Sequence, residues 1–338
     1  MQFETRVKAQ RGTWTKRVWT IAVCALLGLM CDSQIVRAQE LVLSDLPLGQ
    51  VCEPGGKRSE DAVWEVSTRR LPKCWVQCDV PWDVHRWEVG CWHPSTASSI
   101  IEASHEPETQ TIIYVHGNWM PVCDARNRAI CVYKALACRS DRPLRFILFS
   151  WPSEKDDRPA RDVISKKPLI SASSNYLAKF VQDLSPEQPV GLLGYSFGGA
   201  IVCGSLHLLA GGALDGQAMC NTPSEVPLMR VSLIAPAFDR TALGVNGRYS
   251  MAFEQVDKMI NLYNSRDPIL RRFRYFDRNT DPIAAGFAGL MVTRAVSPLN
   301  ANEKIVQYDC SAVGRSHAEL EYLQCSHYFT AIDNVLSR

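Results

Sequence analysis

The sequence feature that most constrains the fold is a serine flanked by glycines between two apolar runs. The segment Gly194-Tyr195-Ser196-Phe197-Gly198-Gly199 follows the short apolar run 189–193 and precedes the longer one at 200–210. A short apolar run bounded by turn residues is typical of a buried strand, and a longer run is typical of a buried helix. The sequence therefore predicts a strand, a sharp turn with Ser196 at its tip, and a helix.

Gly194 and Gly198 stand two residues before and after Ser196. A serine on so tight a turn adopts strained backbone angles, and glycine on either side lets the strand and the helix approach closely. The turn raises the hydroxyl above the sheet, and the start of the helix favours developing negative charge. A Gly-x-Ser-x-Gly pattern alone arises by chance, but between a strand and a helix it indicates a nucleophile.

From residue 109 onward, strand-like and helix-like runs alternate along the chain. Strands are expected at 111–115, 144–149, 189–193, 230–235, 259–263 and 303–308. Helices are expected at 125–138, 171–184, 198–210, 251–256 and 328–336, with a charged loop at 153–167. This alternation predicts an α/β fold with a mostly parallel sheet flanked by helices on both faces.

The N-terminal part of the chain divides into two segments. Residues 1–38 combine a basic stretch with an apolar run of roughly 13 residues and the tripeptide Val36-Arg37-Ala38, which predicts a signal peptide cleaved after Ala38. The apolar run is shorter than the about 20 residues that span a bilayer, so no stable membrane span is expected after cleavage. We therefore expect export to the periplasm, the cell surface or the medium.

Residues 39–107 are rich in cysteine and tryptophan, with short alternating runs at 64–66, 75–77 and 86–89. We interpret this extension as edge strands and loops of the same domain as residues 108–338.

The chain has 13 cysteines, of which Cys24 and Cys31 would leave with the signal peptide. Cys203 lies in an apolar helical run and is expected to be an unpaired, buried thiol. The other ten are expected to form disulfides in an oxidising compartment, with a connectivity that sequence does not define.

Zinc is the competing interpretation of the first cysteines, because Cys74, Cys78, Cys91 and His93 lie near one another. Their spacing fits no standard zinc module, so neither a metal nor a cofactor is expected. Without residues 1–38 the chain has 31 basic and 33 acidic side chains. No basic field remains for a nucleic-acid partner, and the sequence does not define an oligomeric state.

A second motif, Tyr114-Val115-His116-Gly117-Asn118, ends a strand about 80 residues before the serine. Acyl transfer to a serine needs two amide donors for the oxyanion. The backbone amide of Phe197 is expected to provide one and that of Asn118 the other. His116 either shapes this loop or is a satisfied core histidine.

Five segments carry a family resemblance when taken in order. They are Tyr114–Asn118, Trp151-Pro152-Ser153, Gly194–Gly199, Ala235–Asp239 and Tyr263–Asp267. Together they resemble the α/β-hydrolase superfamily, in particular a bacterial branch of largely uncharacterised serine-hydrolase-like proteins. The resemblance covers residues 110 to 338 and implies the chain order serine, acid, histidine.

The resemblance places the acid at Asp267, just past an expected strand and before Pro268. Asp239, after the preceding strand, is the alternative, and Asp281 ranks third. Such an acid orients the imidazole that takes the serine proton.

Two histidines follow the last expected strand, and the resemblance favours His327 at the start of the final helix over His317. Cys310 and Cys325 are candidates to tether the intervening loop. The sequence thus predicts an exported serine hydrolase that acts on a small carboxylic-ester-like substrate. The alternative is a catalytically silent binding protein with the same fold.

Overall fold

The computed structural model describes residues 57–74, 80–106, 108–155, 159–184, 189–220, 226, 228–275, 281–291 and 304–337. The expected signal peptide at 1–38 and the strand-like run at 75–77 lie outside the described residues.

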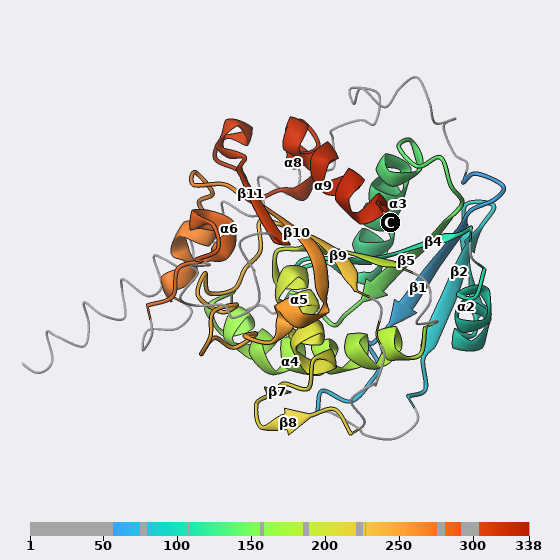
Figure 1. The fold of residues 1–338 in the computed structure, drawn as a ribbon, viewed down its shortest axis with the longest axis horizontal. Helices are drawn as coiled ribbons and strands as arrows, with labels where there is room; N and C mark the ends of the chain where they lie inside the picture. Colours follow the sequence, from blue (N-terminus) through green and yellow to red (C-terminus); the bar gives the residue numbers. More distant parts are fainter. Residues whose placement is uncertain are drawn as a thin grey trace, which may run out of the picture.

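Within the described residues, a nine-stranded sheet has the order β11-β10-β9-β6-β4-β5-β1-β2-β3 (Figure 1). Its strands are β1 Ala62–Ser67, β2 Asp83–Glu88, β3 Cys91–Ser95, β4 Gln110–Val115, β5 Leu144–Ser150, β6 Val190–Tyr195, β9 Met229–Ile234, β10 Val256–Tyr263 and β11 Ile305–Asp309. Neighbours from β11 to β1 pair in parallel, and β2 and β3 add an antiparallel edge. The mostly parallel sheet predicted from the sequence is confirmed. A separate hairpin pairs β7 Ala213–Leu214 with β8 Gln217–Ala218.

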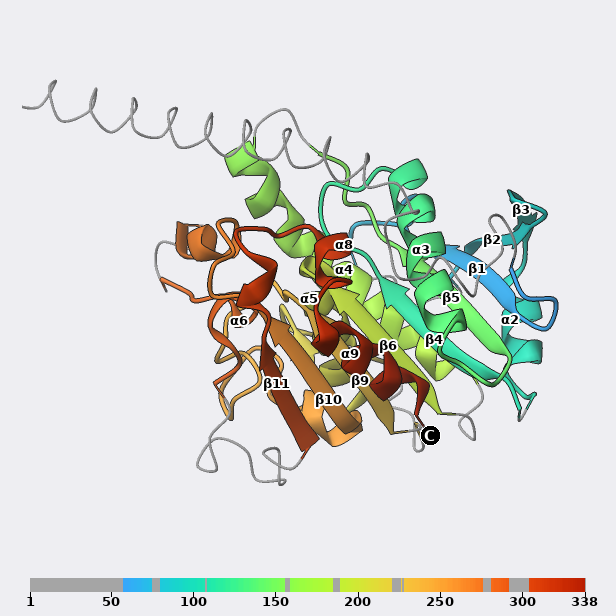
Figure 2. The same cartoon turned by 90° about the horizontal axis from the view of Figure 1, so that it is seen from above.

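Helices cover both faces of this sheet, as Figures 1 and 2 show. The α-helices are α2 Ala97–Ala103, α3 Val122–Ala137, α4 Pro159–Gln182, α5 Phe197–Leu209, α6 Ala285–Ala288, α8 Glu319–Tyr322 and α9 Ser326–Leu336. Short 3-10 helices are η2 Ala252–Gln255, η3 Leu270–Tyr275 and η4 Ser311–Val313. Helices α4 and α5 pack together on one face, and α3 and α9 lie on the other (Figure 1).

The central strands are continuous apolar runs because both of their faces are covered. Every residue of β4, β5 and β6 is buried. Parallel strands that lie between two layers of helices have this composition, whereas a strand with one face in water would alternate apolar and polar residues.

Helix α4 begins earlier than the sequence predicted, at Pro159, inside the segment expected to be a charged loop. Proline is favoured in the first turn of a helix, and α4 continues through Pro168, which cannot donate a helical hydrogen bond. Asp162 and Lys166 lie one turn apart and form an ion pair at 3.1 Å within α4. The helix expected at 251–256 is reduced to η2, because β10 already begins at Val256.

The edge strands that precede residue 108 belong to the same sheet. β1 pairs in parallel with β5, so the extension continues the hydrogen-bonded ladder. The buried carboxylate of Asp61 accepts a hydrogen bond from the Leu144 amide at 2.8 Å and from the Tyr133 hydroxyl at 2.6 Å. Arg58 pairs with the same carboxylate at 2.8 Å. This cluster joins the start of β1 to β5 and α3.

The order of the strands fixes where a ligand site can form. The chain runs from β4 to β5 on one side and then crosses to β6 on the other side of β4. In open α/β sheets, ligands bind at the carboxyl ends of the strands where this direction reverses. Val115 pairs with Gly194 across β4 and β6, which brings Gly117 to the level of Ser196.

The described cysteines are mostly free thiols, and Cys138 is disulfide-bonded. Cys203 is buried and free, and burial raises the pKa of its thiol. The Cys325 thiol donates to the Cys310 sulfur at 3.3 Å, so these two are in contact without being bonded. Pairing of the free thiols after export stays a prediction. In the described part of the chain, no helix has the length and apolarity needed to cross a bilayer.

Candidate active site

Ser196 occupies the tip of the turn between β6 and α5. Its backbone angles are φ 53° and ψ −120°, in the region that side chains other than glycine rarely adopt. The Ser196 amide donates to the Ile234 carbonyl at 3.0 Å, and its carbonyl accepts from the Ala237 amide at 3.0 Å. Bonds to the last residue of β9 and to the segment after it therefore stabilise the strained turn.

The two glycines of the motif are required by close backbone contacts. A Cβ atom on Gly198 would lie 2.0 Å from the Val115 carbonyl oxygen. A Cβ atom on Gly194 would lie 2.8 Å from the Gly199 Cα. Any side chain at either position would push α5 away from β4 and β6.

A single imidazole reaches the serine hydroxyl, and it is that of His317. Its Nε2 lies 3.0 Å from Ser196 Oγ, and its Nδ1 lies 2.6 Å from Asp267 Oδ2. Asp267 is fully buried, and its Oδ1 accepts from the Ile269 and Leu270 amides at 2.8 and 3.0 Å. The three side chains thus form a continuous line of hydrogen bonds.

This geometry corrects the preference for His327. His327 lies in the first turn of α9 and stacks on the Tyr308 ring of β11, with ring centroids 4.3 Å apart. The sequence pattern identified the helix start correctly but not the direction of the preceding loop. That loop passes over the strand ends and carries His317 to Ser196.

Asp239 and Asp281, the other acids considered, have different partners. Asp239 Oδ1 accepts from the Thr241 amide at 2.8 Å, and Oδ2 accepts from the Ile283 amide at 3.2 Å. Asp281 forms an exposed ion pair with Arg274 at 2.7 Å. Asp267 is the acid that the structure brings to His317.

Two residues that the sequence analysis missed hold the His317 loop from the serine side. The Tyr195 hydroxyl donates to the His317 carbonyl. The Asn264 side-chain amide donates to the carbonyls of Gly314 and Ser316 at 2.9 and 3.1 Å. Tyr195 immediately precedes Ser196 in the chain, and Asn264 lies shortly before Asp267. This closeness in sequence was the only signal that could have identified the two residues.

Glu319 holds the same loop from the other end. Its Oε2 accepts from the Tyr114 hydroxyl at 2.7 Å and pairs with Arg128 at 3.2 Å. The carboxylate is buried, and this burial raises its pKa. Arg128 and Tyr114 thus connect the segment after His317 to α3 and β4.

The two segments expected to provide oxyanion-binding amides lie next to Ser196. Phe197 is the first residue of α5, and the first N–H groups of a helix have no partner within it. A Cβ atom on Gly117 would lie 3.3 Å from the Ser196 Cβ and 2.7 Å from the Tyr195 ring. The loop that carries Asn118 therefore lies directly against the nucleophile turn.

A buried ion pair on α4 orients this loop. Asp162 Oδ2 accepts from the Asn118 side-chain amide at 3.2 Å and from the Trp119 indole. Trp119 has a φ of 58°, so its backbone is strained. Lys166 balances the buried carboxylate at 3.1 Å. The sequence analysis placed both residues in a charged loop and so missed this role.

Lys166→Met is expected to lower the free energy of unfolding by about 3 kcal/mol, because it removes the ammonium group that lies 3.1 Å from the buried Asp162 carboxylate. The matched control is Lys179→Met on the same helix, whose partially exposed pair with Asp183 at 2.5 Å is expected to contribute less than about 1 kcal/mol. Urea denaturation of both variants measures the difference. Equal losses of unfolding free energy in the two variants would contradict a stabilising role for the buried Asp162–Lys166 pair.

His116 supports the loop as a neutral side chain. Its Nδ1 donates to the Gly117 carbonyl at 2.9 Å, and its Nε2 accepts from the Trp151 amide at 3.2 Å. Full burial, together with the nearby Arg69 guanidinium, lowers the pKa of His116 to about 3 from its ordinary value of 6.5. It is therefore a structural part of the loop and does not lie against Ser196.

The low pKa of His116 predicts a loss of stability in mild acid. Below pH 6.5 the unfolded state binds a proton that the folded state does not bind until about pH 3, so the free energy of unfolding falls over this window. Between pH 7 and pH 5 this contribution amounts to about 2 kcal/mol. Urea denaturation of wild type and His116→Gln at both pH values measures it. An equal fall in the free energy of unfolding of wild type and His116→Gln would show that His116 does not cause the pH dependence.

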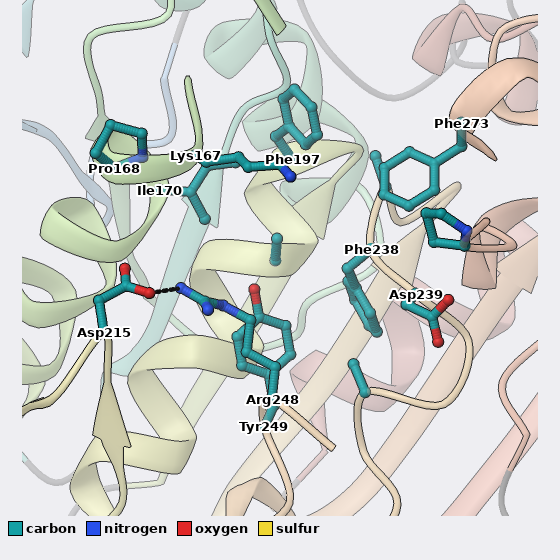
Figure 3. A pocket seen from close by; sticks show the side chains of 14 residues that line it. Lys167, Pro168, Ile170, Phe197, Asp215, Phe238, Asp239, Arg248, Tyr249 and Phe273 are labelled. Carbon is teal, nitrogen blue, oxygen red and sulfur yellow. Dashed lines mark hydrogen bonds and ion pairs between the residues drawn. The ribbon is translucent and has the colours of Figure 1, made fainter. Parts of the chain in front are cut away.

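A cavity of about 410 Å³ opens beside the serine. Figure 3 shows its lining, to which α5 contributes Phe197 and Ala200, and the segment after β9 contributes Ala237 and Phe238. No group of three or more potential metal ligands occurs among the described side chains. The site thus combines the hydrogen-bonded Ser196, His317 and Asp267 with a largely apolar cavity that borders the start of α5.

The strand order, the strained serine turn and the late histidine together define an α/β hydrolase. Residues 94–270, just over half of the chain, match the model of a family described as "Alpha/beta hydrolase of unknown function (DUF900)", and the chain belongs to this family. The superfamily resemblance found in the sequence is confirmed.

Searches of solved structures find distant likenesses. Acyl-protein thioesterase 2 of Zea mays is 15% identical, with 69% of this chain and 96% of that chain covered and a TM-score of 0.34. Inhibited esterase B of Lactobacillus rhamnosis is 14% identical over 91% and 94%, with a TM-score of 0.36. An acetylxylan esterase is 14% identical over 69% and 100%, with a TM-score of 0.31. No curated protein matches the chain.

Proposed function

We propose that this protein is an exported serine hydrolase that cleaves a carboxylic-ester-like bond. The observation that supports the proposal is the line of hydrogen bonds from Ser196 Oγ through both nitrogens of His317 to Asp267. This arrangement of an activated hydroxyl, a base and a buried orienting acid recurs in acyl-transfer enzymes on unrelated folds.

In the proposed reaction, Ser196 attacks the carbonyl carbon of the substrate while His317 Nε2 takes the hydroxyl proton. Asp267 keeps the proton on Nδ1 and stabilises the imidazolium that forms. The amides of Phe197 and Asn118 donate to the oxyanion of the tetrahedral intermediate. His317 then gives its proton to the leaving alcohol, and water hydrolyses the acyl-enzyme by the same route.

The basic and apolar pattern of residues 1–38 supports export. If the signal peptide is cleaved after Ala38, the secreted protein begins at Gln39. Mass spectrometry of the protein recovered outside the cytoplasm tests this boundary. Recovery of the intact N-terminus would contradict cleavage.

Hydrolysis of p-nitrophenyl butyrate by the purified protein tests the proposed activity, with Ser196→Ala as the matched variant. The proposal predicts turnover that the variant loses. A folded protein that binds small esters without turnover would instead support the binding-protein alternative.

A further inference from the structure

The cavity beside Ser196 has a composition and a position that define a substrate class. Two of its lining residues are immediate neighbours of the nucleophile. Phe197 follows Ser196 in the chain, and the Ala237 amide donates to the Ser196 carbonyl at 3.0 Å. The cavity therefore borders the turn that carries Ser196.

The imidazole does not contribute to the walls of the cavity. His317 and Tyr195 do not line it; its walls come from α4, α5 and the segments around Phe238, Tyr249 and Phe273 (Figure 3). The proposed general acid must reach the oxygen of the leaving alcohol, so the alcohol lies next to His317. The cavity, which His317 does not line, is then left for the acyl group.

The walls of the cavity are largely apolar. Phe197, Ala200, Phe238, Ala242 and Tyr249 line it and are all buried. Ala200 and Ala242 have the smallest side chains among these five, and a larger residue at either position would reduce the space.

The acidic side chains of the lining are already engaged by neighbouring groups. Arg248 Nη2 donates to Asp215 and to the Ser171 hydroxyl, both at 2.8 Å, and Figure 3 shows the ion pair between Asp215 and Arg248. Asp239 accepts from the amides of Thr241 and Ile283. With Lys167, the lining holds two cationic and two anionic side chains, so it offers no excess charge to an ionised acyl group.

We propose that this cavity is the acyl pocket and that the substrates are esters with an uncharged, apolar acyl chain longer than acetyl. This assignment rests on the proposed hydrolase function and specifies its substrate class. Each buried methylene is worth about fourfold in kcat/KM, so p-nitrophenyl butyrate is expected to exceed the acetate by about 15-fold. An ester whose acyl chain ends in a carboxylate is expected to react more slowly than the neutral ester of equal length.

Ala242→Leu tests the pocket directly. The added side chain shortens the space, so kcat/KM for p-nitrophenyl octanoate is expected to fall at least tenfold while that for the acetate changes less than threefold. Ala200→Val, on α5, is expected to lower kcat/KM for the octanoate relative to the acetate in the same way. The matched control, Ala103→Leu on α2, makes a similar substitution far from the cavity and is expected to leave the profile unchanged.

A second comparison separates the acyl side from the alcohol side. Ala242→Leu is expected to slow hydrolysis of ethyl octanoate and to spare octyl acetate. The reverse result would assign the cavity to the alcohol and overturn the inference.

Labelling of Ser196 by a fluorophosphonate distinguishes failure of the proposed acyl pocket from failure of the proposed hydrolase function. Labelling and turnover with the same kcat/KM for all acyl chains would overturn the pocket and leave the hydrolase function standing. Absence of both labelling and turnover in folded protein would overturn the hydrolase function and the pocket with it.

Discussion

Replacement of His317 by alanine is expected to lower kcat for ester hydrolysis by about 10⁴-fold or more. Nε2 of this imidazole lies 3.0 Å from Ser196 Oγ, and no other described imidazole is hydrogen-bonded to that oxygen. Without it the hydroxyl keeps its proton, and the leaving alkoxide has no acid. Steady-state kinetics with p-nitrophenyl butyrate measure the loss, with KM expected to change far less than kcat.

His327→Ala is the control for this experiment. Its ring stacks on Tyr308 and lies in α9, outside the line of hydrogen bonds at the serine. The variant is expected to keep kcat within a few-fold of wild type. A large loss in His327→Ala with activity retained in His317→Ala would reverse the assignment of the base.

Asp267→Asn is expected to lower kcat by about 10⁴-fold while leaving the fold intact. The carboxylate accepts from His317 Nδ1 at 2.6 Å, which keeps the proton on Nδ1 and leaves Nε2 free to take the serine proton. An amide that donates at this position would favour the opposite tautomer. The expected defect therefore lies in kcat and not in the free energy of unfolding.

Asp309→Asn provides a matched control for Asp267→Asn. Asp309 ends β11 and caps the same loop through the Ser311 amide at 2.8 Å, but it is exposed. Its substitution is expected to change kcat less than about threefold. Equal losses in the two variants would indicate that loop stability, and not imidazole orientation, explains the effect.

The fold could be predicted from the sequence because its strongest signals are local. The buried strands β4, β5 and β6 are continuous apolar runs, and the glycines around Ser196 meet backbone atoms of their neighbours. A steric requirement of this kind leaves a pattern that can be read without any knowledge of distant contacts.

The choice between the two late histidines depends on distant contacts instead. His317 reaches Ser196 because the Tyr195 hydroxyl and the Asn264 amide bind its loop, and these partners lie 122 and about 50 residues away in the chain. No pattern in the residues next to His317 indicates that its loop runs toward Ser196. The family pattern at the start of the last helix therefore favoured His327, whereas the structure places His317 at Ser196.

The start of α4 was missed for a related reason. Asp162 and Lys166 are charged, and an interior proline follows them, which together are typical of a solvated loop. The buried Asp162 carboxylate accepts hydrogen bonds from Asn118 and Trp119 in the loop after β4, and Lys166 pairs with the same carboxylate. From the sequence alone, a charged side chain that is paired by a distant segment cannot be distinguished from one that is hydrated.

Reaction with an alkyl fluorophosphonate, followed by intact-mass measurement and peptide mapping, tests most directly whether His317 activates Ser196. The account predicts one phosphonyl adduct on Ser196 in wild type and in His327→Ala, and a labelling rate at least a hundredfold lower in folded His317→Ala. Labelling of His317→Ala at the wild-type rate, or an adduct on a different residue, would contradict it.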